Sequence, residues 1–298
     1  MRLQVASLRN FVANNNTDLL YIAVLNSQLA EMNQQLGKTA DALNVMQVLI
    51  NINYNKDSSA HHGYALNQAM QFLLLTNGPI VLRAETDIVW ILDSDIFLTG
   101  PTNLLVELQN NPLVSMMQSR YGLQYLWPNF LILHLQHLKD YKELDFAPAI
   151  AQDSNGTRWS LDSGGSTSIF IASHPEIAVT GIRNIECNDA SDLCEFYRQQ
   201  VQDVPDHCSP PTIMEYSERQ DRCVSTSSLT YEQASDCQIF ARFYHLGSAG
   251  SNWRGCPEGY LRQKRKILKE FFMAKMSPHV IEQHFEETNG QRYQERWR

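Results

Sequence analysis

The sequence predicts an α/β fold: a mostly parallel, Rossmann-type sheet with helices on both faces. Through the first hundred residues, apolar runs of strand length alternate with amphipathic stretches of helix length, as in βαβ chains. The run Ile88–Leu92 is entirely apolar and rich in β-branched and aromatic residues, which is typical of a strand buried on both faces. Asp93 and Asp95 follow it directly. Because ligands of such sheets bind beyond the carboxyl ends of strands, this strand end is the expected functional site.

Each expected element follows from a local pattern. Helices are expected where apolar residues recur at three- and four-residue spacing, strands where a short apolar run is continuous, and loops where polar residues gather. Up to the strand 88–92, these patterns predict helix 3–12, strand 18–25, helix 28–36, strand 44–52, loop 53–60 and helix 64–75. Beyond it they predict helix 103–109, strand 113–117, loop 144–148, strand 167–172, strand 239–244 and helix 261–273.

Composition is that of an ordinary globular protein. The 298 residues are 43% hydrophobic and 19% charged, enough for one large or two modest domains. The net charge of −8 disfavours a surface that binds nucleic acid. No membrane segment is expected, because no run approaches the roughly 18–20 apolar residues that cross a bilayer. The first residues, Met1–Leu8, lack the apolar core of a signal peptide.

The six cysteines all lie between Cys187 and Cys256, and none forms a C-x-x-C pair. This gives little support to a structural zinc site. An even number of cysteines in one loop-rich stretch favours disulfides, and so an oxidising compartment such as the lumen of the secretory pathway. The connectivity stays open, and reduced cysteines in a cytoplasmic enzyme are the alternative.

The acidic motif Asp93-Ser94-Asp95 lies between two apolar segments, since Ile96–Leu98 follow it. Burying two carboxylates without a counter-charge would be costly. A divalent metal that carries a diphosphate is one solution, and a pair of basic side chains is another. A loop that contains Asp-x-Asp by chance is the simpler alternative.

In its context Trp-Ile-Leu-Asp-Ser-Asp-Ile-Phe, this motif resembles the Asp-x-Asp signature of nucleotide-sugar glycosyltransferases with the GT-A fold. The resemblance implies that Asp95 binds Mn²⁺ or Mg²⁺ directly, that Asp93 contacts ribose or metal, and that Ser94 belongs to the donor site. His62, Gly63 and Asn67 match the family's pattern ahead of the motif, where a helix N-terminus approaches the nucleotide or the sugar. A plain helix N-terminus with a serine cap is the alternative.

A second segment with family resemblance is Asp162-Ser163-Gly164-Gly165, which is similar to the one GT-A enzymes place beside donor sugar and acceptor. Two glycines allow the backbone to approach a ligand closely. Asp162 is then a candidate for binding sugar hydroxyls or for deprotonating the acceptor, and a tight turn is the alternative. Asp189 and Asp192 compete with it as catalytic base, because inverting GT-A enzymes often carry that base at a helix start. A helix cap is the alternative for Asp192.

Late in the sequence, His245 follows a short apolar strand and precedes a Gly/Ser loop. It resembles the late histidine of many GT-A enzymes, which completes the metal site, and a neutral imidazole suits Mn²⁺. Gly247 and Ser251 are expected to offer backbone N–H groups to phosphate, and Arg254 to neutralise the leaving diphosphate. A structural histidine is the alternative.

Aromatic residues cluster between Tyr121 and His134. The first interpretation is core packing. The functional alternative is an acceptor platform, since sugar rings stack on aromatic faces.

The resemblance covers about residues 15–260. It implies a catalytic domain over 1–260, with a donor half over about 1–110 and an acceptor half over about 111–260, followed by a basic helix and tail over 261–298. The family normally opens with a strand that holds the base and ribose. Here either the start is truncated or Met1–Ala6 forms a short edge strand.

The expected reaction is metal-dependent transfer, with inversion, of a sugar from a nucleoside diphosphate sugar to a hydroxyl. The acceptor is a glycan, a protein or a small molecule, and the expected compartment is the Golgi. A nucleotidyltransferase and a non-catalytic carbohydrate-binding relative are the alternatives.

Overall fold

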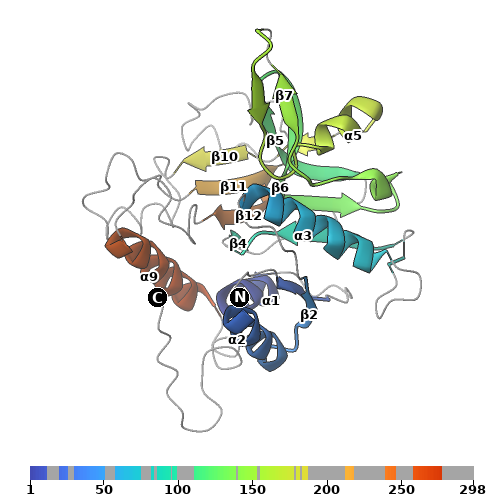
Figure 1. Ribbon diagram of the computed structural model, residues 1–298. Coiled ribbons are helices and arrows are strands. Elements are labelled where there is room, and N and C mark those ends of the chain that lie inside the picture. Colours follow the sequence, from blue (N-terminus) through green and yellow to red (C-terminus); the bar gives the residue numbers. More distant parts are fainter. Residues whose placement is uncertain are drawn as a thin grey trace. The chain divides into compact units, whose positions relative to one another are not determined.

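The computed structural model describes residues 1–11, 20–25, 30–50, 58–74, 82–83, 86–94, 96–98, 111–138, 140–152, 155–177, 179–181, 183–186, 212–217, 239–245 and 258–276. The chain divides into two compact units. Unit 1 comprises Met1–Thr17, Ser94–Leu104 and Arg183–Arg298, and unit 2 comprises Asp18–Asp93 and Leu105–Ile182. Figure 1 shows their helices and strands, labelled where there is room.

Unit 2 is built on a four-stranded sheet in the order β3 (Ile88–Leu92), β6 (Leu123–His134), β5 (Leu113–Arg120), β9 (Val179–Gly181). β6 is antiparallel to both β3 and β5, whereas β5 and β9 are parallel. Two smaller pairs complete the unit: parallel β1 (Ile22–Leu25) and β2 (Met46–Leu49), and antiparallel β7 (Ile150–Gln152) and β8 (Arg158–Ser160). Helix α2 (Ala30–Ala42) connects β1 to β2.

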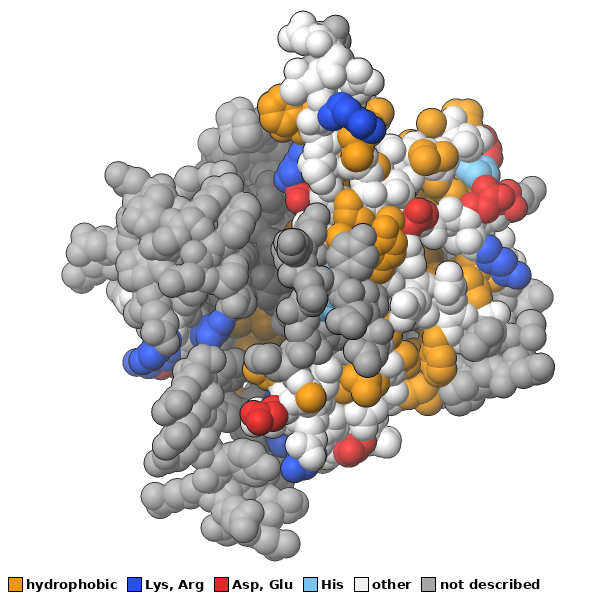
Figure 2. Space-filling view, in the orientation of Figure 1, with side chains coloured by type: hydrophobic (Ala, Val, Ile, Leu, Met, Phe, Trp, Pro, Cys, Tyr) orange, Lys and Arg blue, Asp and Glu red, His pale blue; other side chains and the backbone are white. Residues whose placement is uncertain are grey.

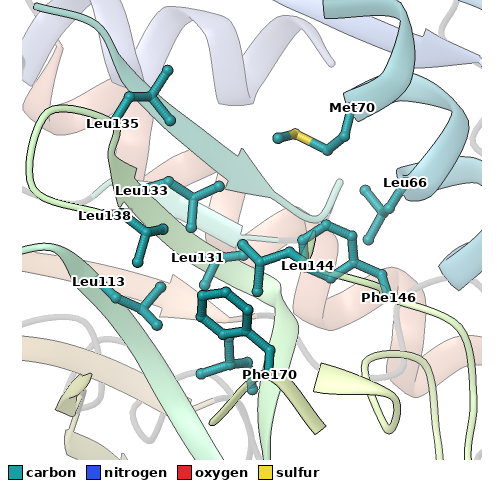
Figure 3. Close-up of a cluster of buried hydrophobic side chains, with 11 residues drawn as sticks. Leu66, Met70, Leu113, Leu131, Leu133, Leu135, Leu138, Leu144, Phe146 and Phe170 are labelled. Atoms are coloured by element: carbon teal, nitrogen blue, oxygen red, sulfur yellow. The ribbon is translucent and has the colours of Figure 1, made fainter. Parts of the chain in front are cut away.

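Helix α3 (Ser58–Leu73) packs on two partners, because it carries two neighbouring apolar stripes. Ala65 and Ala69 pack with Ile50, the residue that follows β2. Leu66 and Met70, again four residues apart, contribute to the main core. In Figure 3 the side chains of α3 meet those of the strands and of α5 (Thr167–Ser173). The buried members of this core are Leu66, Met70, Leu113, Leu126, Leu131, Leu133, Leu135, Leu138, Leu144, Phe146 and Phe170.

The end of α5 is tied to a 3₁₀ turn, η2 (Tyr141–Glu143), through His174. Its Nδ1 lies 3.0 Å from the Phe170 carbonyl oxygen, and its Nε2 lies 3.5 Å from Asp140 Oδ2 and 4.0 Å from Glu143 Oε2. The hydrogen bond to that carbonyl raises the pKa of His174 above its usual range, and the nearby carboxylates of Glu176, Glu143 and Asp140 add to the rise. Protonation therefore strengthens this contact.

Unit 1 contains an antiparallel sheet in the order β10 (Arg183–Glu186), β11 (Thr212–Ser217), β12 (Ile239–His245), β4 (Ile96–Leu98). Helices α1 (Arg2–Phe11) and α9 (Glu258–Lys275) belong to the same unit. All three residues of β4 are buried, and Phe97 packs against Phe272 with ring centroids 5.9 Å apart. Gln4 Nε2 donates a hydrogen bond of 3.0 Å to the Ile96 carbonyl oxygen.

The predicted α/β class is confirmed as a mixed fold of small sheets, but the prediction of a mostly parallel sheet is wrong for the described strands. Among them, only β1–β2 and β5–β9 run parallel. The apolar run Ile88–Leu92 is half-buried rather than buried on both faces, because β3 ends the order of described strands in its sheet. None of the described helices is long and apolar enough to cross a membrane.

Two local predictions are also wrong. The segment 167–172, expected as a strand, is helix α5: Thr167 and Ser168 donate their hydroxyls to the carbonyls of Gly164 and Gly165, which starts a helical turn. Helix α3 begins at Ser58, not at 64. The helix predicted over 3–12 is confirmed as α1, so Met1–Ala6 do not form the short edge strand that was one alternative. The predicted helix over 103–109 lies outside the described residues.

Candidate functional site

The candidate site of unit 2 begins with one face of the N-terminal half of α3. Ser59, His62, Gly63 and Asn67 share this face, because they follow the three- and four-residue spacing of a helix. Ser59 Oγ donates to Asp162 Oδ1 over 3.3 Å, and His62 Nδ1 lies 3.1 Å from Ser163 Oγ. The helix therefore contacts the predicted acceptor segment directly.

Gly63 allows this close approach. A Cβ built on it would overlap the Phe146 carbonyl oxygen and would lie 3.2 Å from Ala147 Cα. Both obstacles are backbone, so neither can move aside as a flexible side chain would. The same Phe146 carbonyl accepts a hydrogen bond of 2.7 Å from the N–H of Gly164. Segment 144–149 thus lies between α3 and the Gly-Gly turn and contacts both.

Asn67, which the resemblance assigns to the donor, uses both ends of its amide within the protein. Its Nδ2 donates to Asp145 Oδ1 over 2.6 Å, and its Oδ1 accepts the backbone N–H of Phe146 over 2.8 Å. Asp145 also accepts the Ala147 N–H over 2.8 Å. Asn67 therefore fixes the segment against which Gly63 packs.

Asp162 carries two partners. Its Oδ2 forms an ion pair with Arg120, and its Oδ1 accepts the Ser59 hydroxyl. The side chains of Asp162 and Arg120 are each 46% exposed, so this carboxylate is open to a ligand. Burial raises the pKa of nearby Tyr125; the charge of Arg120 lowers this pKa, and the charge of Asp162 raises it further. The phenol therefore keeps its proton at neutral pH.

Arg120 is a site residue that the sequence analysis missed. It ends β5, and a two-residue turn, Tyr121-Gly122, separates it from β6. Arg120 forms its ion pair with Asp162, a residue far away in the sequence, so no local sequence pattern predicts this contact.

Asp93 is anchored by Asn129, a second residue that the sequence analysis missed. The Asp93 N–H donates to the Asn129 carbonyl, and Asn129 Nδ2 donates to Asp93 Oδ2, each over 2.8 Å. The register of β5 and β6 shifts between Ser115 and Met117, which marks a bulge over residues 127–130 of β6. Ser115 Oγ lies 3.2 Å from the Phe130 carbonyl oxygen inside it. Bulges redirect side chains, and this one brings Asn129 to Asp93.

His62 is neutral at neutral pH. Burial lowers its pKa below the usual value, and His61 lowers it further, while the charge of Asp93 acts in the opposite direction. An uncharged imidazole has one nitrogen that donates and one that accepts, so its contact with the Ser163 hydroxyl works in either tautomer.

The structure does not describe the three predicted metal ligands together in one unit. Asp93 belongs to unit 2, and Asp95 lies outside the described residues. In unit 1, the Cα of His245 pairs with that of Ile96, the residue that follows Asp95 in the sequence. The described residues contain no group of three acidic, histidine or cysteine side chains that could hold a metal. The predicted metal site stays a prediction.

The remaining predicted residues, apart from Ser94, lie outside the described ranges. Ser94 is described and exposed. The residues outside the described ranges are Asp189, Asp192, Gly247, Ser251, Arg254 and the six cysteines, so the predictions made for them stay untested.

No protein-family model, curated protein or solved structure matches this chain.

Proposed function

We propose that this chain is a metal-dependent glycosyltransferase with a GT-A-like fold, which transfers a sugar from a nucleoside diphosphate sugar to a hydroxyl. One observation supports this most: two separate segments that resemble GT-A motifs, the start of α3 and Asp162-Ser163, contact each other within unit 2. The N-terminal face of α3 contacts Asp162 and Ser163, and the charge of Asp93 acts on His62. A chance set of motifs would have no reason to converge.

In the proposed reaction Asp162 is the general base. The acceptor hydroxyl hydrogen-bonds to this carboxylate and gives it the proton while its oxygen attacks the anomeric carbon of the donor sugar. The bond from that carbon to the diphosphate oxygen breaks, and nucleoside diphosphate leaves. Attack from the opposite face inverts the anomeric centre. Arg120 and Ser59 hold the carboxylate in place until the acceptor arrives.

The donor end of the site would lie at Asp93. Asn129 occupies Oδ2 and so orients the carboxylate, and such an oxygen ligand suits a hard cation. By the resemblance, Asp93, Asp95 and His245 would hold Mn²⁺ or Mg²⁺. The metal would supply Lewis-acid stabilisation of the departing diphosphate. The proposed compartment is the Golgi lumen, on the disulfide prediction alone.

The test combines a thermal-shift assay with product analysis. The protein is incubated with Mn²⁺ and a panel of nucleoside diphosphate sugars, and melting temperature and donor hydrolysis are recorded. A donor at a hundredfold its Kd should stabilise the fold by about 2.7 kcal/mol. Asp93→Asn and Asp95→Asn should abolish the metal-dependent shift. Asp87→Asn, at the other end of β3, is the matched control and should keep it.

The outcomes separate the alternatives. Release of pyrophosphate from nucleoside triphosphates, in place of sugar transfer, would identify a nucleotidyltransferase. Binding of sugars that needs neither metal nor nucleotide would identify a non-catalytic carbohydrate-binding protein. A shift that survives Asp95→Asn unchanged would refute the proposed donor site.

A further inference from the structure

The tip of the β5–β6 hairpin carries an unusual residue. Tyr121 and Gly122 form its two-residue turn and have φ angles of +52° and +79°. Positive φ at both positions is the pattern of a type I′ turn, which favours Asn or Gly at its first position. A bulky aromatic residue in this conformation is strained, and such strain is found where a side chain is needed for function.

The ring of Tyr121 stacks on Trp159 of β8. The ring centroids lie 4.6 Å apart and the planes differ by 7°, yet the two residues are still 46% and 38% exposed. The hairpin that carries Trp159 packs on the β5–β6 hairpin through Ala151, Leu161 and Tyr125. In Figure 2 the β7–β8 hairpin, which Figure 1 labels β7 at the top of the view, exposes hydrophobic and basic side chains. Two packed hairpins therefore hold an exposed aromatic pair.

Charged groups lie close to this pair in the sequence. Arg120 directly precedes Tyr121, Asp162 follows Trp159 by three residues, and the two charged side chains form an ion pair. An aromatic pair with a carboxylate and a guanidinium close by in the sequence offers groups for both sides of a sugar ring. One side of such a ring carries C–H groups that pack on aromatic faces, and its rim carries hydroxyls that bond to charged groups.

We propose that Tyr121 and Trp159 form a platform for a sugar ring of the acceptor, which makes the acceptor a glycan rather than a peptide or a lipid. The inference rests on the proposed function, because it takes Asp162 to be the group that the acceptor hydroxyl reaches. A simple clasp between two hairpins would need no strained tyrosine, since Asn-Gly closes the same turn without strain.

The test uses Tyr121→Asn, which keeps the turn chemistry and removes the ring. Binding of a panel of methyl glycosides of glucose, galactose, mannose and N-acetylglucosamine is measured by saturation-transfer NMR. At least one glycoside should bind wild type and bind Tyr121→Asn at least tenfold more weakly. Tyr121→Phe, which keeps the ring, should retain binding. Ile150→Asn should also retain it, because Ile150 is exposed on the other face of the β7–β8 hairpin.

The same variants are tested for stabilisation by Mn²⁺ and nucleotide sugar, so that the two proposals fail separately. Loss of glycoside binding in Tyr121→Asn with donor stabilisation intact supports the platform. Equal glycoside binding by Tyr121→Asn and wild type, or no binding by any glycoside of the panel, overturns it. Ring-dependent glycoside binding in a protein that no donor stabilises supports the platform and overturns the transferase.

Discussion

Asn67→Ala tests how segment 144–149 is held beside the candidate site. The variant loses the bond to the Asp145 carboxylate and leaves the Phe146 N–H without its acceptor. The first loss, at an exposed pair, is worth about 1 kcal/mol, and an unsatisfied buried N–H costs about 1–3 kcal/mol. Alanine returns about 0.5 kcal/mol of helix propensity. The expected net loss is about 2 kcal/mol, or about 4–8 °C in melting temperature.

The assay is urea denaturation followed by circular dichroism, with Gln68→Ala as the matched control. Gln68 is the next residue of α3 and is exposed, so its truncation should change the free energy of unfolding by less than about 0.5 kcal/mol. If both variants unfold at the wild-type urea concentration, Asn67 does not hold this segment and the reasoning is wrong.

Asn67→Asp sharpens the same test. The introduced oxygens still accept the Phe146 N–H, but one of them faces Asp145 where the amide donor lay at 2.6 Å. Repulsion raises a carboxyl pKa of this pair in the folded state above its unfolded value of about 3.9. The folded protein then binds more protons than the unfolded chain, so stability increases as the pH falls through this range. A variant whose loss of stability is the same at all pH values would contradict this.

Gly63→Ala should lower stability by about 1–3 kcal/mol in thermal melts, because overlap with the Phe146 backbone outweighs the helix propensity gained. Asn129→Ala should weaken the Mn²⁺-dependent thermal shift, because Asp93 loses its anchor. The pKa of His174 is raised in the folded protein, so its protonation stabilises the fold fully below the ordinary histidine pKa of about 6.5. This stabilisation should be lost as the pH rises above that value. Wild type should therefore lose stability over this range, and His174→Gln should not show this loss.

Each of these has a contrary outcome. A Gly63→Ala protein as stable as wild type would mean that segment 144–149 moves away freely. An unchanged metal response in Asn129→Ala would detach Asp93 from the proposed donor site. Urea titrations at several pH values that give parallel curves for wild type and His174→Gln would remove His174 as the source of the pH dependence.

Local sequence patterns correctly predicted the helices and strands whose formation depends mainly on the residues within them. The apolar run Ile88–Leu92 is a strand, and the regularly spaced apolar residues after Gly63 lie in a helix. The segment 167–172 was predicted wrongly because its apolar composition suits a strand, while hydrogen bonds to the preceding glycines begin a helix. Sheet direction was also predicted wrongly, since strand pairing depends on contacts between distant segments.

The residues of the candidate site also fall into two groups: those that a local motif could indicate and those that only the fold brings to the site. The acids and glycines of the two motifs could be singled out from the sequence because their residue types suit the proposed chemistry. Arg120 and Asn129 were not, because each acts through one partner that only the fold brings near. A register shift in a strand leaves no periodic signal in the sequence.

The bulge in β6 has a consequence for how this chain can vary. Asn129 holds Asp93, and the preceding Pro128 lies where a Cβ on Gly164 would come within 2.7 Å of its Cδ. Deleting one bulge residue would realign the strand and displace the acid and the glycine turn together. The distance between Asp93 and the turn at Gly164 thus depends on the bulge in β6. We therefore expect inherited changes to be rarer in the bulge than in the residues that flank Asp93 or Gly164.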